Sequence, residues 1–292
     1  MERSRPHRGG FWTNLTRVTP VLFLLIAFAL SCTSVNKLRR EYEAGDDSKL
    51  DKLIEIAGRG DYPYGTRKNA VVALGEIGDP RAVPILIQTL RQYERRTTLQ
   101  EAAIVALGKI GDRRAVEAIG HVLDRSVMDP AKADLRLNAW SALGDLGGDE
   151  AAGILVNGLV FFDKLMLREE QRSARGVFSG DEQGLQAWRD SLRVPRGIQQ
   201  SGGGGGGLFP QDNYPSVSMF GTPMDELDRP MEDYTPQERN LAHGSLVQVG
   251  EDAVSVIIKH VETKETTLTL RAELDSIVEE ILRARDSTSP GS

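Results

Sequence analysis

Ala73-Leu74-Gly75-Glu76-Ile77-Gly78-Asp79 recurs as Ala106-Leu107-Gly108-Lys109-Ile110-Gly111-Asp112 and, more loosely, as Ala142-Leu143-Gly144-Asp145-Leu146-Gly147-Gly148. The first alanines of the three copies are 33 and 36 residues apart. A period of this length is typical of stacked helical hairpins, in which each hairpin buries its apolar side against the next. The sequence therefore predicts a helical solenoid.

The first copy shows how one hairpin is encoded. Apolar residues recur at helical spacing before the turn and again after it, in the groups Ala70, Val71, Ala73, Leu74, Ile77 and Val83, Leu86, Ile87, Leu90. Gly78 suits the left-handed position after a helix, Asp79 can cap the next helix, and Pro80 fits a first turn. Pro84 is expected inside the second helix, where it would remove a hydrogen bond and cause a slight bend.

The second and third copies repeat this pattern. Thr98 and Glu101 have the spacing of a capping box at the start of the second hairpin. In the third copy the aspartate is displaced by one residue to Asp149, which lengthens the turn. Asp79, Asp112 and Asp149 are therefore interpreted as helix caps.

These motifs resemble bacterial HEAT repeats of the phycobilisome-lyase type, whose mark is Ala-Leu-Gly-x-Ile/Leu-Gly-Asp followed by Ala-Val/Ala-x-x-Leu. The resemblance covers about residues 64–160. It implies an all-α fold of the α-α superhelix class, a HEAT-repeat solenoid, with four to six hairpins. A weaker copy at Ser245–Gly250 predicts a fourth hairpin.

Composition divides the rest of the chain. Residues 32–63 are expected to form an N-terminal linker and capping helices, 64–163 the HEAT-like repeats, and 164–194 a degenerate helical repeat. Residues 195–235 contain the glycine run Gly202–Gly207 and several prolines, which predicts a disordered insertion. Residues 236–285 are expected to form a C-terminal repeat with a capping helix, and 286–292 a disordered tail. Within the insertion, Phe209, Tyr214, Met219 and Phe220 could form a docking peptide, or the insertion could have no role.

The N-terminus is interpreted as a lipoprotein signal peptide over residues 1–31. Four arginines precede an apolar run from Val21 to Leu30, which is too short to cross a bilayer. Ala29-Leu30-Ser31-Cys32 resembles the lipobox of bacterial lipoproteins, which implies acylation of Cys32, for example with palmitate. Two alternatives stay open: an ordinary secretory signal or an uncleaved anchor. Cys32 is the chain's single cysteine, so no internal disulfide can form.

The resemblance to lipoproteins places the protein in the bacterial envelope, facing the periplasm. Thr33 and Ser34 follow the cysteine without an aspartate, which favours the outer over the inner membrane. Lys37, Arg39 and Arg40 either contact anionic headgroups or form a solvated helical turn. Cleavage before Cys32 would remove four arginines and one glutamate, which leaves a net charge of −9. A chain this acidic, without a basic stripe, is a poor candidate for binding nucleic acid.

No motif indicates catalysis or a cofactor. His121, His243 and His260 are followed by Val, Gly and Val, so the His-Glu pairs that hold iron in HEAT-type hydroxylases are missing. No Gly-x-Ser-x-Gly sequence occurs, and the glycine run lacks the Lys-Ser/Thr of a phosphate loop. We therefore expect no cofactor, no metal and no enzymatic activity.

The expected function is that of a noncatalytic, lipid-anchored scaffold that binds an envelope protein or peptide. A solenoid leaves one continuous concave surface, and we expect second helices to line it. The residues predicted on this surface are Arg81, Gln88, Arg91, Glu117 and Asp124. The alternatives are a HEAT-family enzyme or a pigment- or metal-handling protein, and a purely structural envelope lipoprotein.

Overall fold

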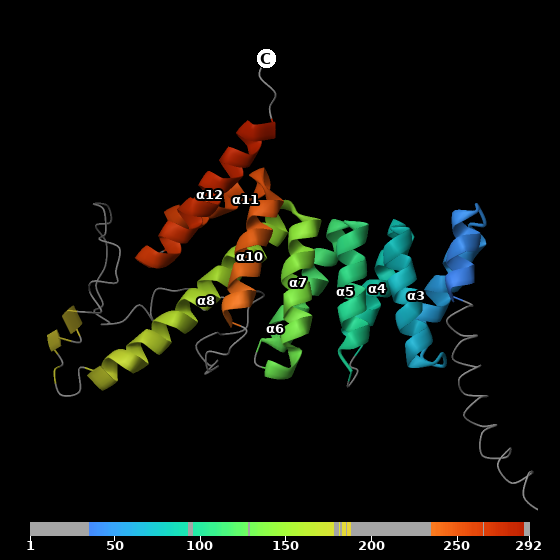
Figure 1. The fold of residues 1–292 in the computed structure, drawn as a ribbon, viewed down its shortest axis with the longest axis horizontal. Helices are drawn as coiled ribbons and strands as arrows, with labels where there is room; N and C mark the ends of the chain where they lie inside the picture. Colours follow the sequence, from blue (N-terminus) through green and yellow to red (C-terminus); the bar gives the residue numbers. More distant parts are fainter. Residues whose placement is uncertain are drawn as a thin grey trace, which may run out of the picture. The chain divides into compact units, whose positions relative to one another are not determined.

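The structure is a computed structural model that describes residues 35–92, 96–127, 129–177, 181, 183–184, 186–187, 235–264 and 266–288 (Figure 1). The predicted signal peptide, Cys32 and the predicted insertion up to residue 234 lie outside the described residues. The chain divides into two compact units, Met1–Ile77 and Gly78–Ser292. The described secondary structure is helical throughout, which confirms the predicted all-α fold class.

The first unit contains a helix at 35–43, α2 (Ser48–Gly58) and α3 (Tyr64–Ile77). Helix α2 packs on α3 and buries Leu50, Leu53 and Ala57, which confirms a helix in the predicted capping region. In α3, Ala70, Val71 and Leu74 are fully buried.

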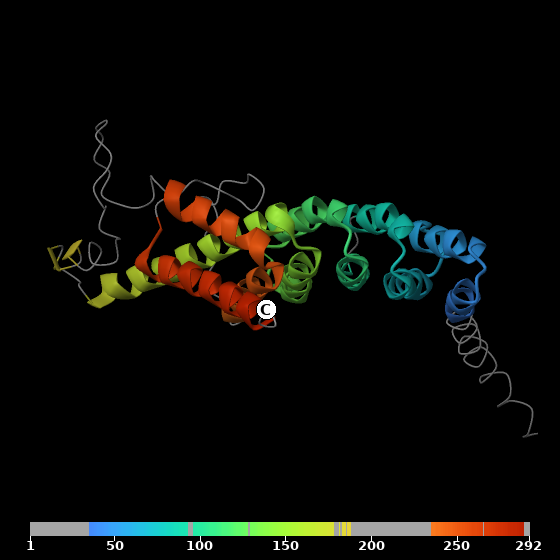
Figure 2. The same cartoon turned by 90° about the horizontal axis from the view of Figure 1, so that it is seen from above.

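The second unit holds the rest of the array. Its helices are η1 (Pro80–Ala82), α4 (Val83–Arg91), α5 (Thr98–Ile110), η2 (Arg113–Ala115), α6 (Val116–Ser126), η3 (Pro130–Lys132), α7 (Ala133–Leu146), α8 (Gly148–Val177), α10 (Thr235–Val249), α11 (Glu251–Thr263) and α12 (Leu268–Thr288). First helices α5, α7 and α10 pack side by side in one layer, and second helices α4, α6 and α8 form the other (Figure 2). Helix α12 packs on α10, α11 and α8 and closes this layered array.

The turns inside the hairpins follow the predicted chemistry. Gly78, Gly111 and Gly147 have φ of 76°, 73° and 63°, the left-handed region that glycine adopts without strain. Asp79 and Asp112 each accept a hydrogen bond from the backbone N–H two residues later, at 2.9 and 3.0 Å. These aspartates therefore cap the short helices η1 and η2, which lead into α4 and α6.

Three local predictions need correction. Asp149 does not cap a helix after a lengthened turn, because α7 ends at Leu146 and α8 already begins at Gly148, which places Asp149 in its first turn.

Pro84 does not bend a helix, because α4 begins at Val83 and Pro84 lies in its first turn, where a backbone N–H has no helical partner. The predicted capping box does not form at Thr98, because Thr98 is the first helical residue of α5. Thr97 is at the N-cap position, and its side chain makes no capping hydrogen bond.

The glycine of the repeated phrase allows close packing between successive first helices. A Cβ added at Gly108 would lie 3.3 Å from the Cα of Ala142 on α7. A Cβ at Gly144 would lie 2.9 Å from the Cβ of Ser245 on α10. Ser245 thus occupies, in the fourth hairpin, the position that Ala142 occupies in the third.

Helix α8 differs from the predicted division at residue 163. It continues unbroken to Val177, so residues 164–177 extend the second helix of the third hairpin instead of starting a separate repeat. Asp163, at the predicted boundary, is buried and accepts hydrogen bonds from the Thr267 hydroxyl at 2.9 and 3.0 Å. The same hydroxyl accepts from the N–H of Leu270, which links α8 to the start of α12.

The C-terminal boundaries shift slightly. Helix α10 begins at Thr235, which had been assigned to the insertion, and α12 continues to Thr288, beyond the predicted start of the tail. Among the described residues, no helix is both long enough and apolar enough to cross a membrane.

Candidate partner-binding surface

A row of mostly exposed residues, many of them polar, runs along one side of the second helices in the second unit. We define this second-helix face by Pro84, Gln88 and Arg91 of α4, Glu117, His121 and Arg125 of α6, and Gly153 and Asn157 of α8. The α4 and α6 residues are exposed, and Gly153 and Asn157 are half-buried. A Cβ added at Gly153 would meet no atom of the described residues within 4 Å, so none of these residues covers this part of α8.

The structure brings three of the five predicted residues together on this face. Gln88, Arg91 and Glu117 lie on it and are exposed. Arg81 instead lies in η1, at the turn, where its guanidinium pairs with Asp79 at 2.7 Å. Asp124 is half-buried beside the face, on α6.

The repeat period also marks residues of this face that were not predicted from the sequence. Gln88, His121 and Asn157 are separated by 33 and 36 residues, the same intervals as the repeated phrase. They therefore occupy equivalent positions on three successive second helices. His121 had been considered only as a possible metal ligand, and Arg125 and Asn157 had not been singled out.

The edge of the face near the ends of α4 and α6 is held by side chains that bridge hairpins. Arg125 donates from Nη2 to the carbonyl of Leu90 at 3.2 Å, and Gln100 donates to the carbonyls of Leu90 and Gln92 at 3.1 Å each. These bonds satisfy carbonyls at the end of α4 that no helical N–H reaches. They fix α4 and α6 relative to each other, so the face is a preorganised surface.

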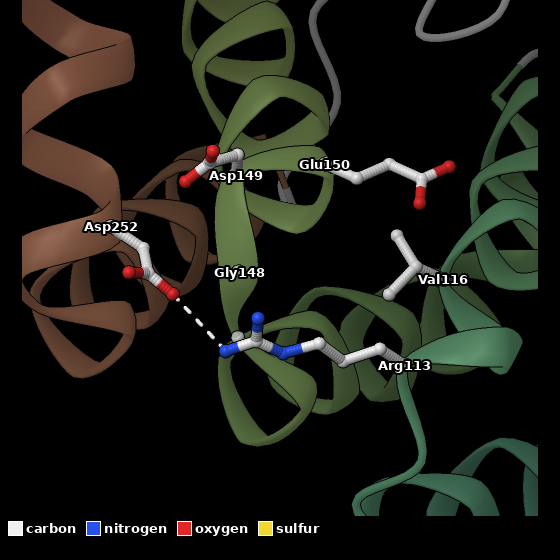
Figure 3. Close-up of a pocket in the computed structure, with 7 residues that line it drawn as sticks. Arg113, Val116, Gly148, Asp149, Glu150 and Asp252 are labelled. Carbon is white, nitrogen blue, oxygen red and sulfur yellow. Dashed lines mark hydrogen bonds and ion pairs between the residues drawn. The ribbon is translucent and has the colours of Figure 1, made fainter.

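A second candidate site lies at the turns of three hairpins. A pocket of about 310 Å³ is lined by Arg113, Val116, Gly147, Gly148, Asp149, Glu150 and Asp252. Arg113 reaches across it to Asp252, at 3.1 Å, while Asp149 and Glu150 project in different directions from the start of α8 (Figure 3). The guanidinium lies against Gly148, where an added Cβ would be 3.0 Å from Cζ. Arg113 thus joins the second, third and fourth hairpins. Its ion pair with Asp252 explains the charged residues of this pocket as contacts that hold the hairpins together.

The three histidines of the described residues lie in three different environments. His121 is exposed, with Nε2 3.7 Å from Glu117. His243 of α10 lies 3.3 Å from Glu273 and 3.6 Å from Glu280 of α12, and Arg239 pairs with the same Glu273. His260 is buried in α11, where desolvation and then Lys264 lower its pKa to about 4. Within the described ranges, no three His, Cys, Asp or Glu side chains form a group that could hold a metal ion.

Comparison with known families gives one match: residues 50–132 match HEAT repeats. The matched region includes α2 to α6 and the first two copies of the repeated phrase. Comparison with curated proteins gives no match. The match supports HEAT repeats over residues 50–132, in agreement with the resemblance of the repeated phrase.

Proposed function

We propose that this HEAT-repeat protein is a noncatalytic scaffold that binds another protein or peptide through the second-helix face. The observation that carries the proposal is the register of that face: three successive second helices present side chains at equivalent positions on one surface. Repeat arrays use such extended surfaces for recognition.

The chemistry of the face supports binding of a polar partner. Gln88, Arg91, Glu117, His121 and Arg125 offer hydrogen-bond donors, acceptors and both signs of charge to solvent. The helices beneath them are fixed by buried apolar residues, among them Leu86, Ile119 and Leu155. Because the backbone that carries these polar side chains is already rigid, binding a partner costs little conformational entropy.

We further propose that acylation of Cys32 anchors the scaffold in the bacterial envelope, facing the periplasm, with the outer membrane favoured. The first described helix begins at residue 35, only three residues after Cys32. Three extended residues span at most about 10 Å. A lipid on Cys32 would therefore hold the first unit close to the bilayer surface.

Two of the three basic residues after the cysteine, Lys37 and Arg39, form ion pairs within the protein. Lys37 pairs with Glu41 at 3.6 Å, and Arg39 pairs with Glu43 and with Glu76 of α3. These pairs support the solvated-helix interpretation over headgroup contact. Membrane attachment in this proposal depends on the lipid.

The test is photo-crosslinking in living cells with the full-length protein. A photoreactive residue replaces Gln88 or His121, and Ser141, exposed on α7 in the other layer, is the matched control position. We expect one reproducible envelope partner from positions 88 and 121 and none from position 141. Equal crosslinking at all three positions, or none at 88 and 121, would contradict binding through this face.

The anchor is tested separately with Cys32→Ser. We expect this variant to lose membrane association while the purified protein keeps its fold and its partner. If Cys32→Ser fractionates with membranes as the unchanged protein does, the lipid anchor is wrong, and the binding proposal is judged on the crosslinks alone.

A further inference from the structure

We propose that Met219 and Phe220 of the insertion bind to an apolar stripe on α11 of the same chain. The stripe consists of Val254, Ile258 and Val261, which lie on one side of the helix because they recur at intervals of four and three residues. This surface is separate from the second-helix face, so the inference goes beyond the proposed function. It also gives a role to the insertion, which the sequence left open.

The stripe is exposed where the preceding second helix is covered. Ile258 is 48% exposed, the largest value among the large apolar side chains of the described residues, and Val254 and Val261 are half-buried. Buried Ala151 and Ala253 stand 102 positions apart near the starts of α8 and α11, and this interval relates the two helices. At the same interval, the α8 residues equivalent to the stripe are at most 1% exposed: Ala152, Val156 and Leu159.

The order of helices in the layer explains this difference. Each earlier second helix of the second unit is followed by another that packs on it: α4 by α6, α6 by α8, and α8 by α11. Among the described residues no second helix follows α11, and α12, the next helix, leaves Ile258 exposed. The stripe is therefore the open end of the second-helix layer. Covering it is favourable, because it removes apolar surface from water.

The length of chain between Phe220 and the start of α10 allows the contact. Phe220 stands 15 residues before Thr235, the first residue of α10, and fifteen extended residues span about 50 Å. The path from Thr235 to Ile258 runs along α10 and the first eight residues of α11, which cover about 22 and 12 Å. These two residues thus lie at most about 40 Å apart, whatever the angle between the helices. Phe220 can reach the stripe.

The chemistry of the segment suits an apolar surface. Met219 and Phe220 lie outside the described residues, but the sequence makes them adjacent large apolar residues, nearer to α10 than Phe209 and Tyr214. A phenylalanine buries about 150 to 250 Å² on contact, and methionine adapts to irregular apolar surfaces. Because the segment is tethered to α10, its effective concentration at α11 is about a millimolar. A small apolar contact is then enough to hold it.

The first experiment traps the contact with a disulfide in the full chain. Cys32→Ser removes the native thiol, and Phe220→Cys is combined with Ile258→Cys. The matched control combines Phe220→Cys with Ser141→Cys, an exposed position on α7, which packs on α10. We expect the 220–258 disulfide to form within one chain, at least about tenfold faster than the 220–141 disulfide.

The second experiment measures docking without introduced thiols, by limited chymotrypsin cleavage of the folded full chain. Ile258→Asp should speed cleavage after Phe220 about threefold or more, because proteolysis follows the population of the undocked segment. Cleavage after Phe209, eleven residues earlier in the insertion, is the internal control and should not change. Thermal unfolding checks that Ile258→Asp keeps its fold.

Three results would overturn the proposal: equal trapping at positions 258 and 141, a 258 disulfide that forms only between chains, or unchanged cleavage after Phe220 in Ile258→Asp. A disulfide only between chains would assign the stripe to a second copy. Unchanged cleavage together with a crosslink from position 258 to another protein in cells would assign it to an outside partner. Each result is independent of the crosslinks at positions 88 and 121, which test the second-helix face.

Discussion

Arg136 of α7 and Glu238 of α10 form a buried ion pair across 102 positions of sequence, with Nη2 2.7 Å from Oε1 and each side chain 1% exposed. Arg136 also donates from Nη1 to the carbonyls of Ser126 and Asp129, at 2.7 Å each. One guanidinium thus joins the end of α6, the turn before α7 and the fourth hairpin. The pair fixes where α10 packs after the long connection from α8.

We predict that Glu238→Leu destabilises the protein by about 3 to 5 kcal/mol, because it removes the carboxylate that faces the buried charge of Arg136. Urea denaturation would measure the change. The double variant Arg136→Met with Glu238→Leu removes both charges and should recover much of that loss. A single variant that loses less than about 1 kcal/mol would show that the pair does not hold the fourth hairpin.

Gly144→Ala should destabilise the protein by about 1 to 3 kcal/mol, because its Cβ would lie 2.9 Å from Ser245 across the α7–α10 contact. The matched control is Gly153→Ala in α8, where the new Cβ meets nothing within 4 Å. This control should stabilise by about 0.5 to 1 kcal/mol, since alanine is the better helix former. Thermal unfolding of the two variants should move in opposite directions, and a common direction would contradict the close packing.

We predict that protonation of His260 lowers the free energy of unfolding as the pH falls from about 6.5 to about 4. Its folded pKa is about 4, against an ordinary value of 6.5, so the unfolded chain binds more protons in that window. The full loss amounts to about 3 kcal/mol and is complete below pH 4. Urea unfolding across this range should show a smaller pH dependence in His260→Leu than in the unchanged protein.

The control for this prediction is His121→Gln, which changes an exposed histidine. It should retain the pH dependence of the unchanged protein. An equal slope in His260→Leu and His121→Gln would exclude His260 as the cause.

Thr267→Val should loosen α12, because the Thr267 hydroxyl both caps the N–H of Leu270 and donates to buried Asp163. We expect a loss of about 1 to 3 kcal/mol, the cost of removing the hydrogen bonds of this hydroxyl to a buried carboxylate and to the N–H of Leu270. In Thr267→Val, hydrogen exchange in α12 should be faster than in the unchanged protein, whereas exchange in α5 should not change. Thr263→Val, which removes an exposed hydroxyl bonded to the carbonyl of Lys259, is the matched control and should leave α12 protected.

The local rules of the sequence predicted most of the hairpin geometry. The repeated phrase indicated where helices end, and Gly78 and Gly111 do adopt the left-handed conformation at those points. Asp79 and Asp112 cap the following turns as predicted. These features depend on residues a few positions apart, so composition and spacing are enough to determine them.

The candidate face was predicted only in part. Gln88, Arg91 and Glu117 lie on it, whereas Arg81 belongs to a turn and pairs with Asp79. The extent of a polar face depends on which side of each helix its neighbours cover. Period and polarity alone do not fix that side for residues near helix ends.

The sequence by itself determined the helical hairpins, their period and their turns, because each hairpin carries its own apolar stripes and its own Gly-Asp signal. Only the tertiary structure decided that α8 continues past residue 163, that α10 packs beside α7, and that Arg136 meets Glu238. These features come from contacts between residues about a hundred positions apart. Their energy arises from burial and charge pairing in the assembled layers, which no short stretch of sequence encodes.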